Sequence, residues 1–313
     1  MIDVLEQTTM TSALDDFKRH CRFERKLDEK TISAYQCDIV QFASLLANGS
    51  ETLVVNVKRD DIQCWLETIS TYKFRTMKRK IASVNAFMRY MEWLFEDFDN
   101  PLRRVRIKLK EPQRLPVVMT KAETGRILAR LDENVRSGKG FSQSHKLAVR
   151  NKAVIELLFG TGMRIGELCG LRNCDVDLER GLVRIIGKGN KERVVDVCMP
   201  VTLAALREWV QVRETPTDTN AFFFTNRLGH GLAPQIVRLL VHQIAKECDI
   251  DKNVTPHTFR HTFATLLLEE NVDVFTIQHI LGHSSISTTQ IYLHVNPVRQ
   301  RDVLTNHHPR SRM

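Results

Sequence analysis

The sequence lacks the features that would place the chain in a membrane or among disulfide-bonded secreted proteins. None of its apolar runs approaches the ~20 residues that a membrane-spanning helix needs. Residues 1–6 have neither the basic start nor the apolar stretch of a signal peptide. The seven cysteines are odd in number, scattered, and contain no CxxC pair, which favours reduced thiols over disulfides or a zinc knuckle. These absences predict a cytoplasmic protein.

The sequence also lacks internal repeats, low-complexity tracts and the carboxylate-rich site that a metal-dependent nuclease requires. Its 313 residues are enough for two domains, and 42% hydrophobic with 27% charged residues is an ordinary globular composition. Positive charge is in excess, with a net charge of +9. Solubility alone would explain such a surplus, but the surplus also predicts a polyanionic partner such as nucleic acid. The excess lies beyond residue 105, because residues 1–105 hold 16 basic and 16 acidic side chains.

The first third of the chain has the pattern of a helical unit. Apolar side chains recur at three- and four-residue spacing over most of residues 12–95. A cap at Ser12 would start one helix. A cap at Thr31 would start the next, which we expect to end at Asn48 and Gly49.

A basic cluster marks the start of the last helix in this unit. Two of its arginines are spaced four residues apart, so they are neighbours on one helix face. A solvated face is one reading, and a helix that contacts DNA phosphates is the other. The residues concerned are Arg75, Lys78, Arg79 and Lys80.

A basic segment of alternating character follows the helical unit. Charged and apolar residues alternate there with a period of two, which is typical of extended chain, and Pro112 and Pro116 discourage a helix. We therefore divide the chain into a helical domain (1–103), a basic linker (104–118) and a second domain (119–313). The linker could follow a nucleic-acid backbone or form an exposed edge strand. Its basic residues are Arg104, Arg106, Lys108 and Lys110.

The second domain combines helices with a β-hairpin. Thr120 and Glu123 have the spacing of a capping box. A helix over 147–159 should pack its apolar face inward. The β-rich runs Leu182–Ile186 and Arg193–Val197 are joined by a turn rich in glycine, which predicts a hairpin. Further helices are expected at 201–213, 233–247, 258–269 and 272–281.

Isolated cationic side chains lie at two turns of this domain. Arg164 follows a glycine at the end of an apolar helix, and Glu167 could either brace it toward a phosphate or simply pair with it. Lys188 lies in the Gly-flanked hairpin turn, where it could deliver a proton to a ligand, although lysines are common in turns. Lys191 and Arg193 make the same turn more basic and could contact DNA phosphate.

Two histidine pairs make a metal site worth considering. His257 and His261 are one helical turn apart, as are His279 and His283. The zincin motif, however, needs a glutamate after its first histidine, and here the next residue is threonine. Arg260 beside the first pair would also oppose a bound cation. We therefore expect no metal and no other cofactor, and we expect one histidine of each pair to work in a phosphate pocket.

Tyr292 is the candidate nucleophile. Most tyrosines late in a helical domain serve only in packing. A phenol with a reference pKa of ~10 attacks poorly until it is activated. Nearby cations favour the phenolate, and guanidinium groups bind phosphate oxygens in pairs. The ordered set of cations and histidines around it therefore indicates chemistry on a phosphodiester, without a metal.

The order of these residues resembles the catalytic set of the tyrosine recombinase (phage integrase) family. The block from His257 to Val295 looks close to the Xer branch, and the likeness extends over nearly the whole chain. Other motifs that carry the likeness are Gly-Thr-Gly-Met-Arg-Ile-Gly-Glu-Leu and Gly-Lys-Gly-Asn-Lys-Glu-Arg. The matching catalytic residues are Arg164, Lys188, His257, Arg260, His283 and Tyr292.

The resemblance implies a mainly helical protein with a small β-sheet, a clamp of two domains around duplex DNA. A helical, SAM-like domain would bind the core site, and an α+β domain would carry catalysis. Tyr292 would form a 3′-phosphotyrosyl bond, and strand exchange would pass through a Holliday junction. Four protomers, alike or shared with a second recombinase, would act on two sites. The reaction would need neither metal nor ATP, and topoisomerase-like relaxation would be a side activity.

The resemblance also implies a role for each residue. Arg164 and Arg260 would clamp the phosphate, Lys188 would act as the general acid, and His257 and His283 would transfer protons or donate to phosphate. Glu167 and His261 would support them.

Some features remain outside the resemblance or open to another reading. Residues 133–146 form a longer stretch than a minimal Xer protein needs. The segment after Tyr292 could dock on a neighbouring protomer or lie in solvent. The sequence does not distinguish dimer resolution from integration and excision, and it does not give the target site. A DNA-binding protein with an inactive recombinase fold and a metal-dependent nuclease are the competing hypotheses.

Overall fold

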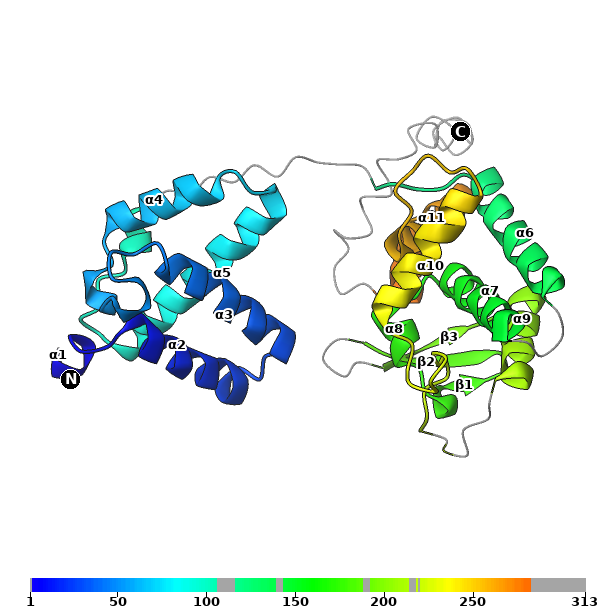
Figure 1. The fold of residues 1–313 in the computed structure, drawn as a ribbon, viewed down its shortest axis with the longest axis horizontal. Helices are drawn as coiled ribbons and strands as arrows, with labels where there is room; N and C mark the ends of the chain where they lie inside the picture. Colours follow the sequence, from blue (N-terminus) through cyan, green and yellow to red (C-terminus); the bar gives the residue numbers. More distant parts are fainter. Residues whose placement is uncertain are drawn as a thin grey trace, which may run out of the picture. The chain divides into compact units, whose positions relative to one another are not determined.

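The computed structural model describes residues 2–105, 116–138, 143–187, 192–213, 218 and 220–282. The chain forms two compact units, Met1–Gln113 and Arg114–Met313, which are coloured blue to cyan and green to orange in Figure 1. Each unit has its own buried apolar core.

Helices build the described part of the first unit. The longest, α5, packs against α2 and α3, and the predicted helical character is confirmed. A π-helical turn at His20–Glu24 extends α2, and 3-10 turns occupy the connections. The helices are α1 (Ile2–Leu5), α2 (Met10–Arg19), α3 (Glu29–Ala43), α4 (Arg59–Ile69) and α5 (Phe74–Leu94).

The predicted caps of this unit were wrong, because each true N-cap lies three residues before the predicted one. Thr9, not Ser12, caps α2, because its hydroxyl accepts from the Ser12 backbone N–H at 3.2 Å. Asp28, not Thr31, caps α3, with the Thr31 N–H donating at 2.8 Å. In each pair, Thr9 with Ser12 and Asp28 with Thr31, both residues are of types that often cap helices, so the sequence alone could not show which of the two is the cap.

The end of α3 was also misplaced. The helix stops at Ala43, and the chain then tightens into turns whose N–H groups bond to carbonyls three residues back, such as Leu46 to Ala43 and Gly49 to Leu46. Gly49 takes a φ of +55° and closes the last turn. The glycine signal therefore marked the end of the turns and not the end of the helix.

Aromatic side chains fill the core of the first unit. Phe17 meets Phe87 edge to face with ring centroids 5.7 Å apart, and Phe42 meets Trp65 in the same way at 5.3 Å. All four are 1% exposed or less. Edge-to-face pairs of this kind add to the hydrophobic gain of burial, which anchors α2, α3, α4 and α5 together.

The second unit combines a small antiparallel sheet with helices, and Val194 and Ile186 of the sheet are exposed. The strand order is β1-β2-β3, and Val183 on β2 pairs with Val176 on β1 and Val195 on β3. The elements are α6 (Lys121–Ser137), α7 (Gln143–Thr161), α8 (Ile165–Gly170), β1 (Val176–Asp177), β2 (Leu182–Ile186), β3 (Glu192–Asp196), α9 (Pro200–Val212), α10 (Pro234–Glu247), α11 (Pro256–Glu269) and α12 (Val274–Leu281).

Most predicted elements of this unit are confirmed. β2 has the predicted bounds, and the Thr120 and Glu123 capping box starts α6. β3 begins one residue earlier than predicted, because Glu192 pairs with Ile186. The short α8 and β1 were not foreseen, since six and two residues are too few to show a period.

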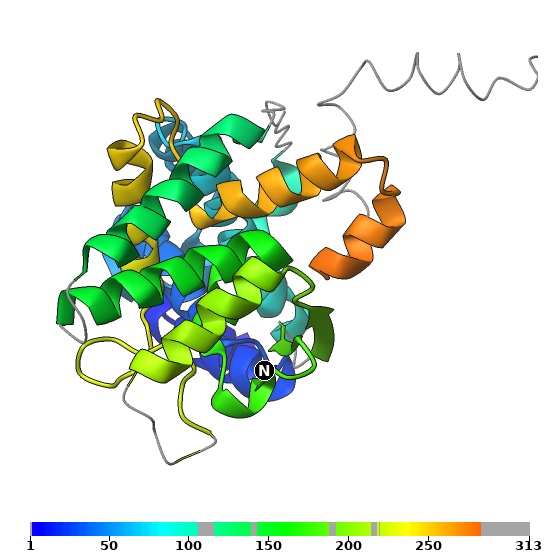
Figure 2. The ribbon, with the colours of Figure 1, turned by 90° about the vertical axis from the view of Figure 1, so that its right-hand side faces the viewer.

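Helix α7 forms the centre of the second core. Val154, Ile155, Leu157 and Leu158 are completely buried, so the helix is apolar on several faces. A helix of this kind must be enclosed on all sides, and α6, α9 and α11 pack around it. Figure 2 shows α6, α7 and α9 side by side, with α11 and α12 in orange next to them. The C-terminal end of α7 therefore emerges from the core in a fixed position.

The described residues hold no helix with both the length and the apolar character needed to cross a bilayer.

Candidate active site

The turn between α7 and α8 presents Arg164. Gly162 in this turn has a φ of +61°, and a Cβ there would lie 2.6 Å from a ring carbon of Phe263 and 2.7 Å from a methyl of Leu281. Such separations are too short for any side chain, so only glycine lets the turn approach α11 and α12 this closely. The close packing places Arg164 beside the helices that carry the other predicted residues.

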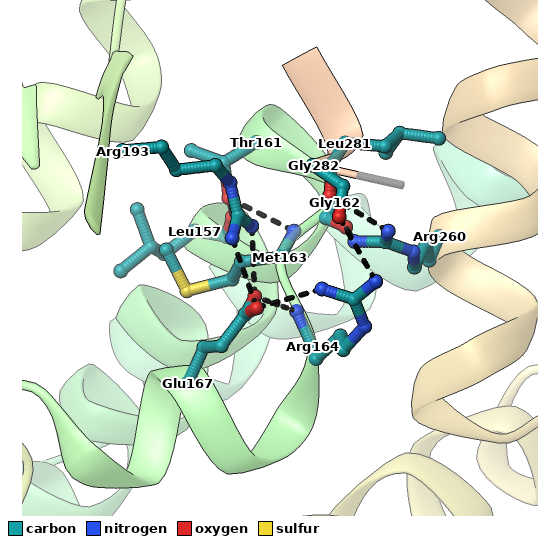
Figure 3. A network of polar contacts seen from close by, with 10 residues as sticks. All are labelled: Leu157, Thr161, Gly162, Met163, Arg164, Glu167, Arg193, Arg260, Leu281 and Gly282. Atoms are coloured by element: carbon teal, nitrogen blue, oxygen red, sulfur yellow. Dashed lines mark hydrogen bonds and ion pairs between the residues drawn. The ribbon is translucent and has the colours of Figure 1, made fainter. Parts of the chain in front are cut away.

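Glu167 binds two arginines at once. Its carboxylate accepts from Arg164 Nη1 at 2.8 Å and from the Arg164 backbone N–H at 2.7 Å. Arg193 from β3 donates to both of its oxygens, at 2.9 and 2.8 Å (Figure 3). Burial alone raises the pKa of Glu167, but the hydrogen bonds from Arg193 and Arg164 outweigh it and lower the pKa to about 2. Glu167 is therefore ionised, and it braces Arg164 as predicted or pairs with it structurally.

Arg260 reaches the same region from α11. The residue is 3% exposed, and its guanidinium donates to the carbonyl of Gly162 at 2.6 Å and to that of Leu281 at 2.8 Å. Arg164 donates to the next carbonyl, that of Gly282, at 3.2 Å. Two guanidiniums from distant parts of the chain thus bind adjacent carbonyls at the C-terminal end of α12 (Figure 3). Carbonyls at a helix C-terminus lack intrahelical partners and attract cations.

The two histidines of α11 are held in the neutral form. Burial lowers the pKa of His257, and the charges of Arg260 and Arg164 lower it further. Burial also lowers the pKa of His261, with the charges of His257 and Arg260 adding to the effect, to about 4. The ring centroids lie 6.5 Å apart. A neutral imidazole beside two guanidiniums can accept or donate a proton during a reaction.

Several predicted residues lie outside the described residues or have no described side chain. The structure brings together Arg164, Glu167, His257, His261 and Arg260, and the remaining assignments stay predictions. The residues outside are Arg106, Lys108, Lys110, Lys188, Lys191, His283 and Tyr292, and Arg104 is described only by its backbone.

The described residues contain no group of three or more histidine, cysteine, aspartate or glutamate side chains that could hold a metal ion. His279 is exposed near the end of α12. Its predicted partner, His283, lies beyond the described residues.

The basic cluster of the first unit is divided between surface and interior. Arg75, Lys78 and Arg79 are exposed, while Lys80 is 6% exposed. The Lys80 ammonium lies 3.1 Å from the carboxylate of Asp38, which also pairs with Arg79. The structure thus gives Lys80 a role inside the unit, which helix spacing could not reveal because the partner lies on α3.

Two residues near the site have roles that the sequence did not suggest. Arg193 was predicted as a DNA contact, but its guanidinium is joined to Glu167. Arg238 on α10 is exposed, and its charge contributes to the lowered pKa of His257. No motif marks Arg238, because only the packing of α10 beside α11 brings it near the histidine.

Known protein families and curated proteins match nearly the whole chain. Residues 118–299 match the phage integrase family, and residues 14–93 match the phage integrase N-terminal SAM-like domain. A tyrosine recombinase of Agathobacter rectalis is 37% identical over 97% of both chains. Tyrosine recombinase XerD of Listeria innocua is 34% identical, over 96% of this chain and 100% of its own.

Solved structures show the same fold. XerA recombinase is 26% identical with a TM-score of 0.52, covering 96% of this chain and 99% of its own. The XerH recombinase bound to its palindromic difH substrate is 24% identical with a TM-score of 0.71, covering 95% of this chain and 84% of its own. The predicted architecture, mainly helical with a small sheet, is thereby confirmed. The chain belongs to the phage integrase family and is an Xer-like tyrosine recombinase, an enzyme that cuts and rejoins DNA at specific sites.

Proposed function

We propose that Tyr292 attacks a phosphodiester of duplex DNA. The phenolate oxygen forms a bond to phosphorus while the bond from phosphorus to the 5′-oxygen breaks, which leaves a 3′-phosphotyrosyl link. Lys188 gives its proton to the departing 5′-oxygen. The free 5′-hydroxyl of the partner strand then gives its proton to Lys188 and attacks the phosphotyrosyl link, and Tyr292 leaves as the phenolate. One round of exchange forms a Holliday junction and a second resolves it, and the covalent link conserves the bond energy.

The convergence of Arg164 and Arg260 carries this proposal. Arg164 comes from the α7–α8 turn and donates to the carbonyl of Gly282, and Arg260 comes from α11 and donates to that of Leu281. A phosphate presents ionised oxygens, which attract the guanidinium charge and accept two parallel hydrogen bonds from it, whereas a backbone carbonyl is a single neutral acceptor. A phosphodiester would therefore take over donors of these arginines, and the two guanidiniums would stabilise the charge that grows in the transition state. Arg164 is accessible for this role, with a side chain 39% exposed.

The histidines and Glu167 fit supporting parts in the same reaction. His257 and His283 would move protons or donate to phosphate, and His261 would hold His257 in place. Glu167 would hold Arg164. No step needs a metal, since the guanidiniums supply the positive charge that a metal would otherwise provide.

We propose that both domains contact the DNA site. The domain division at 1–103, 104–118 and 119–313 is supported by the two compact units and by the two family matches. Candidate phosphate contacts in the first unit are the exposed Arg75, Lys78 and Arg79. Further candidates, from the linker and the hairpin, are Arg104, Arg106, Lys108, Lys110 and Lys191.

We further propose that four copies, or two copies with two of a second recombinase, act on two DNA sites in the cytoplasm. Support comes from a lambda integrase tetramer bound to a Holliday junction, which has the same fold with a TM-score of 0.69 at 16% identity, over 91% of this chain and 77% of its own. Two roles fit this chemistry equally, the resolution of dimeric replicons and the integration or excision of an element.

The test begins by finding a DNA site. The full chain is incubated with a randomised duplex library, and the bound sequences are recovered. A half-site with a nick beside the cleavage position is then incubated with the protein in EDTA and run on a denaturing gel. We expect a covalent protein–DNA band that Tyr292→Phe abolishes while DNA binding is retained. Tyr35→Phe, which removes a hydroxyl in the first unit and keeps the ring packed on Phe17, is the matched control and should leave the band.

Three results would each contradict the proposal. An adduct that persists in Tyr292→Phe would place the nucleophile elsewhere. Cleavage that requires added Mg2+ would indicate a nuclease. Tight binding to the selected sites without an adduct on any nicked substrate would indicate a DNA-binding protein with an inactive fold.

A further inference from the structure

Arg193 occupies a junction between three parts of the second unit. It lies on β3, shortly after the hairpin turn that holds Lys188. Its side chain is 17% exposed, and its guanidinium forks onto both oxygens of Glu167. Figure 3 shows this guanidinium and that of Arg164 meeting at the same carboxylate. A guanidinium that donates two parallel hydrogen bonds to a carboxylate fixes the orientation of the carboxylate and also balances its charge.

Arg193 also packs against the backbone that leads into His283. A Cβ on Gly282 would lie 2.9 Å from Cδ of Arg193, 3.0 Å from its Nε and 3.1 Å from its Cζ. Gly282 has a φ of +64°, and its carbonyl accepts from Arg164. The Arg193 side chain therefore rests on the very residue whose carbonyl Arg164 binds, one position before His283.

We propose that Arg193 is a positioning residue of the active site, which couples the β2–β3 hairpin to Arg164 through Glu167 and to the stem of His283 through Gly282. The assignment rests on the proposed function, because it matters only if Lys188, Arg164 and His283 act together. It replaces the expectation that Arg193 contacts DNA phosphate.

Charge sharing gives Arg193 a specific effect on Arg164. Glu167 accepts four hydrogen bonds, two from Arg164 and two from Arg193. Each oxygen accepts one bond from Arg193 and one from Arg164, whose backbone N–H binds Oε2 and whose Nη1 binds Oε1, so the Arg164 guanidinium keeps Nη2 directed to Gly282. Without Arg193, the carboxylate would draw both ends of the Arg164 guanidinium to itself, and Arg164 would stabilise the charge of the transition state less well.

The first experiment replaces Arg193 in the full chain and measures single-turnover adduct formation on the nicked half-site. Arg193→Met keeps much of the volume and removes the donors, and we expect the rate to fall about 10- to 100-fold. Arg193→Lys keeps the charge without the fork and should also be slow. The dissociation constant for intact DNA and its salt dependence should stay at the wild-type values. A phosphate contact would instead weaken binding and lower the salt slope by about one.

A pH profile separates positioning from mere stabilisation. Arg164 and Arg193 are the charged groups that contact Glu167. Once Arg193 is gone, two of the interactions that lower the pKa of Glu167 are lost and its pKa rises, so Arg193→Met should lose cleavage at a higher pH than wild type as the solution is acidified. Adding Glu167→Gln should remove this change in the acid limb, because the carboxylate that takes up the proton is gone. If Arg193 only stabilised the fold, Arg193→Met would change the rate of adduct formation and leave its pH profile unchanged.

A substitution at Gly282 tests the contact between Gly282 and the Arg193 side chain. Gly282→Ala introduces a strained φ and pushes on Arg193, whereas Gly229→Ala has a similar φ of +78° with open space around it. We expect Gly282→Ala to slow adduct formation by the same order as Arg193→Met and Gly229→Ala to leave the rate near wild type. Arg193→Met added to Gly282→Ala should cost little more, because the two changes break one contact.

Each outcome supports or overturns the proposal. A folded Arg193→Lys with the wild-type rate, or a loss of cleavage in Arg193→Met that only follows weaker binding, overturns it. If Arg193→Met does not fold by circular dichroism, Arg193→Lys and Gly282→Ala decide. If the wild-type protein forms an adduct and all these variants form it at the same rate, the role of Arg193 is refuted and the proposed function is not. A wild-type protein without any adduct refutes the proposed function first.

Discussion

Each unit of the chain has a cluster in which one buried carboxylate binds two cationic side chains, Asp38 in the first unit and Glu167 in the second. The two clusters differ in which further groups accept hydrogen bonds from these cations. Asp38 in the first unit has a fully buried side chain and accepts from Arg79, Lys80 and Ser83. Glu167 in the second unit has a side chain 6% exposed and accepts from Arg164 and Arg193. The chemistry of the two clusters is alike, yet only the second lies among the predicted catalytic residues.

The origin of the cations explains the difference. Arg79 and Lys80 are successive residues of one helix, and Lys80 places its ammonium on Asp38 and Gln41, so its charge is used up inside the unit. Arg164 and Arg193 come from a turn and from a strand. One carboxylate then neutralises two guanidiniums only in part, and Arg164 keeps a donor for another acceptor. An acid shared between separate elements can therefore hold Arg164 ready for a ligand, whereas Asp38 holds the Lys80 ammonium in the interior and leaves only Arg79 at the surface.

The largest effect on stability should come from breaking the first cluster. Asp38→Ala leaves the buried Lys80 ammonium without its carboxylate, and we expect the first unit to lose ~3–5 kcal/mol. Because the chain has two units, hydrogen exchange of the α3 and α5 amides is the suitable measurement. Asp15→Ala removes an exposed pair with Lys18 and should cost ~1 kcal/mol or less. Equal losses in the two variants would remove the basis for calling the first cluster a packing device.

Breaking the second cluster should affect catalysis more than stability. Arg164→Ala removes a half-exposed guanidinium that we assign to the phosphate, so single-turnover adduct formation should fall about 100- to 1,000-fold. Hydrogen exchange in α7 should change little, since Arg164 buries little apolar surface. Arg172→Ala, at another turn of the same unit, is the matched control. A large loss of α7 protection without a loss of cleavage would show that Arg164 is structural.

The smallest effect concerns acid stability. The pKa of Glu167 is about 2, below its ordinary value of 4.5, so its ionised form stabilises the folded unit above pH 4.5 and this contribution is lost as the pH falls toward 2. Wild type should lose stability over this range by up to ~1.4 kcal/mol per pH unit more than Glu167→Gln. Glu270→Gln, at an exposed pair with Lys121, should change the slope far less. Identical slopes for wild type and Glu167→Gln, by circular dichroism at graded pH, would mean that Glu167 is not held ionised by its arginines.

Regular elements were predictable from the sequence because their signals are local. The apolar period identified the helices, and β-branched runs around a glycine-rich turn identified β2 and β3. The errors occurred at ends, as at Thr9, Asp28 and Ala43, where two neighbouring residues offered equally good chemistry. The very short α8 and β1 escaped because a period cannot appear within a few residues.

The site was predictable as a list of residue types and only partly as an arrangement. Arg164, Glu167, His257 and Arg260 were singled out from their chemistry and their neighbours, and the structure brings these four together. The partners of Lys80 and Arg193 were not predictable in this way. Each side chain is held by a carboxylate on another element, and no spacing rule connects a strand to a helix turn.

The sequence by itself determined the helical and hairpin segments, the basic excess and the ordered set of cations, histidines and tyrosine, because each depends on residue type and short spacing. The tertiary structure decided which cations meet. The bonds from Arg193 to Glu167, from Arg260 to Gly162 and from Arg164 to Gly282 join residues 26, 98 and 118 positions apart. These contacts exist because the buried α7 delivers its turn against α11 and α12, and only glycine at positions 162 and 282 allows the approach.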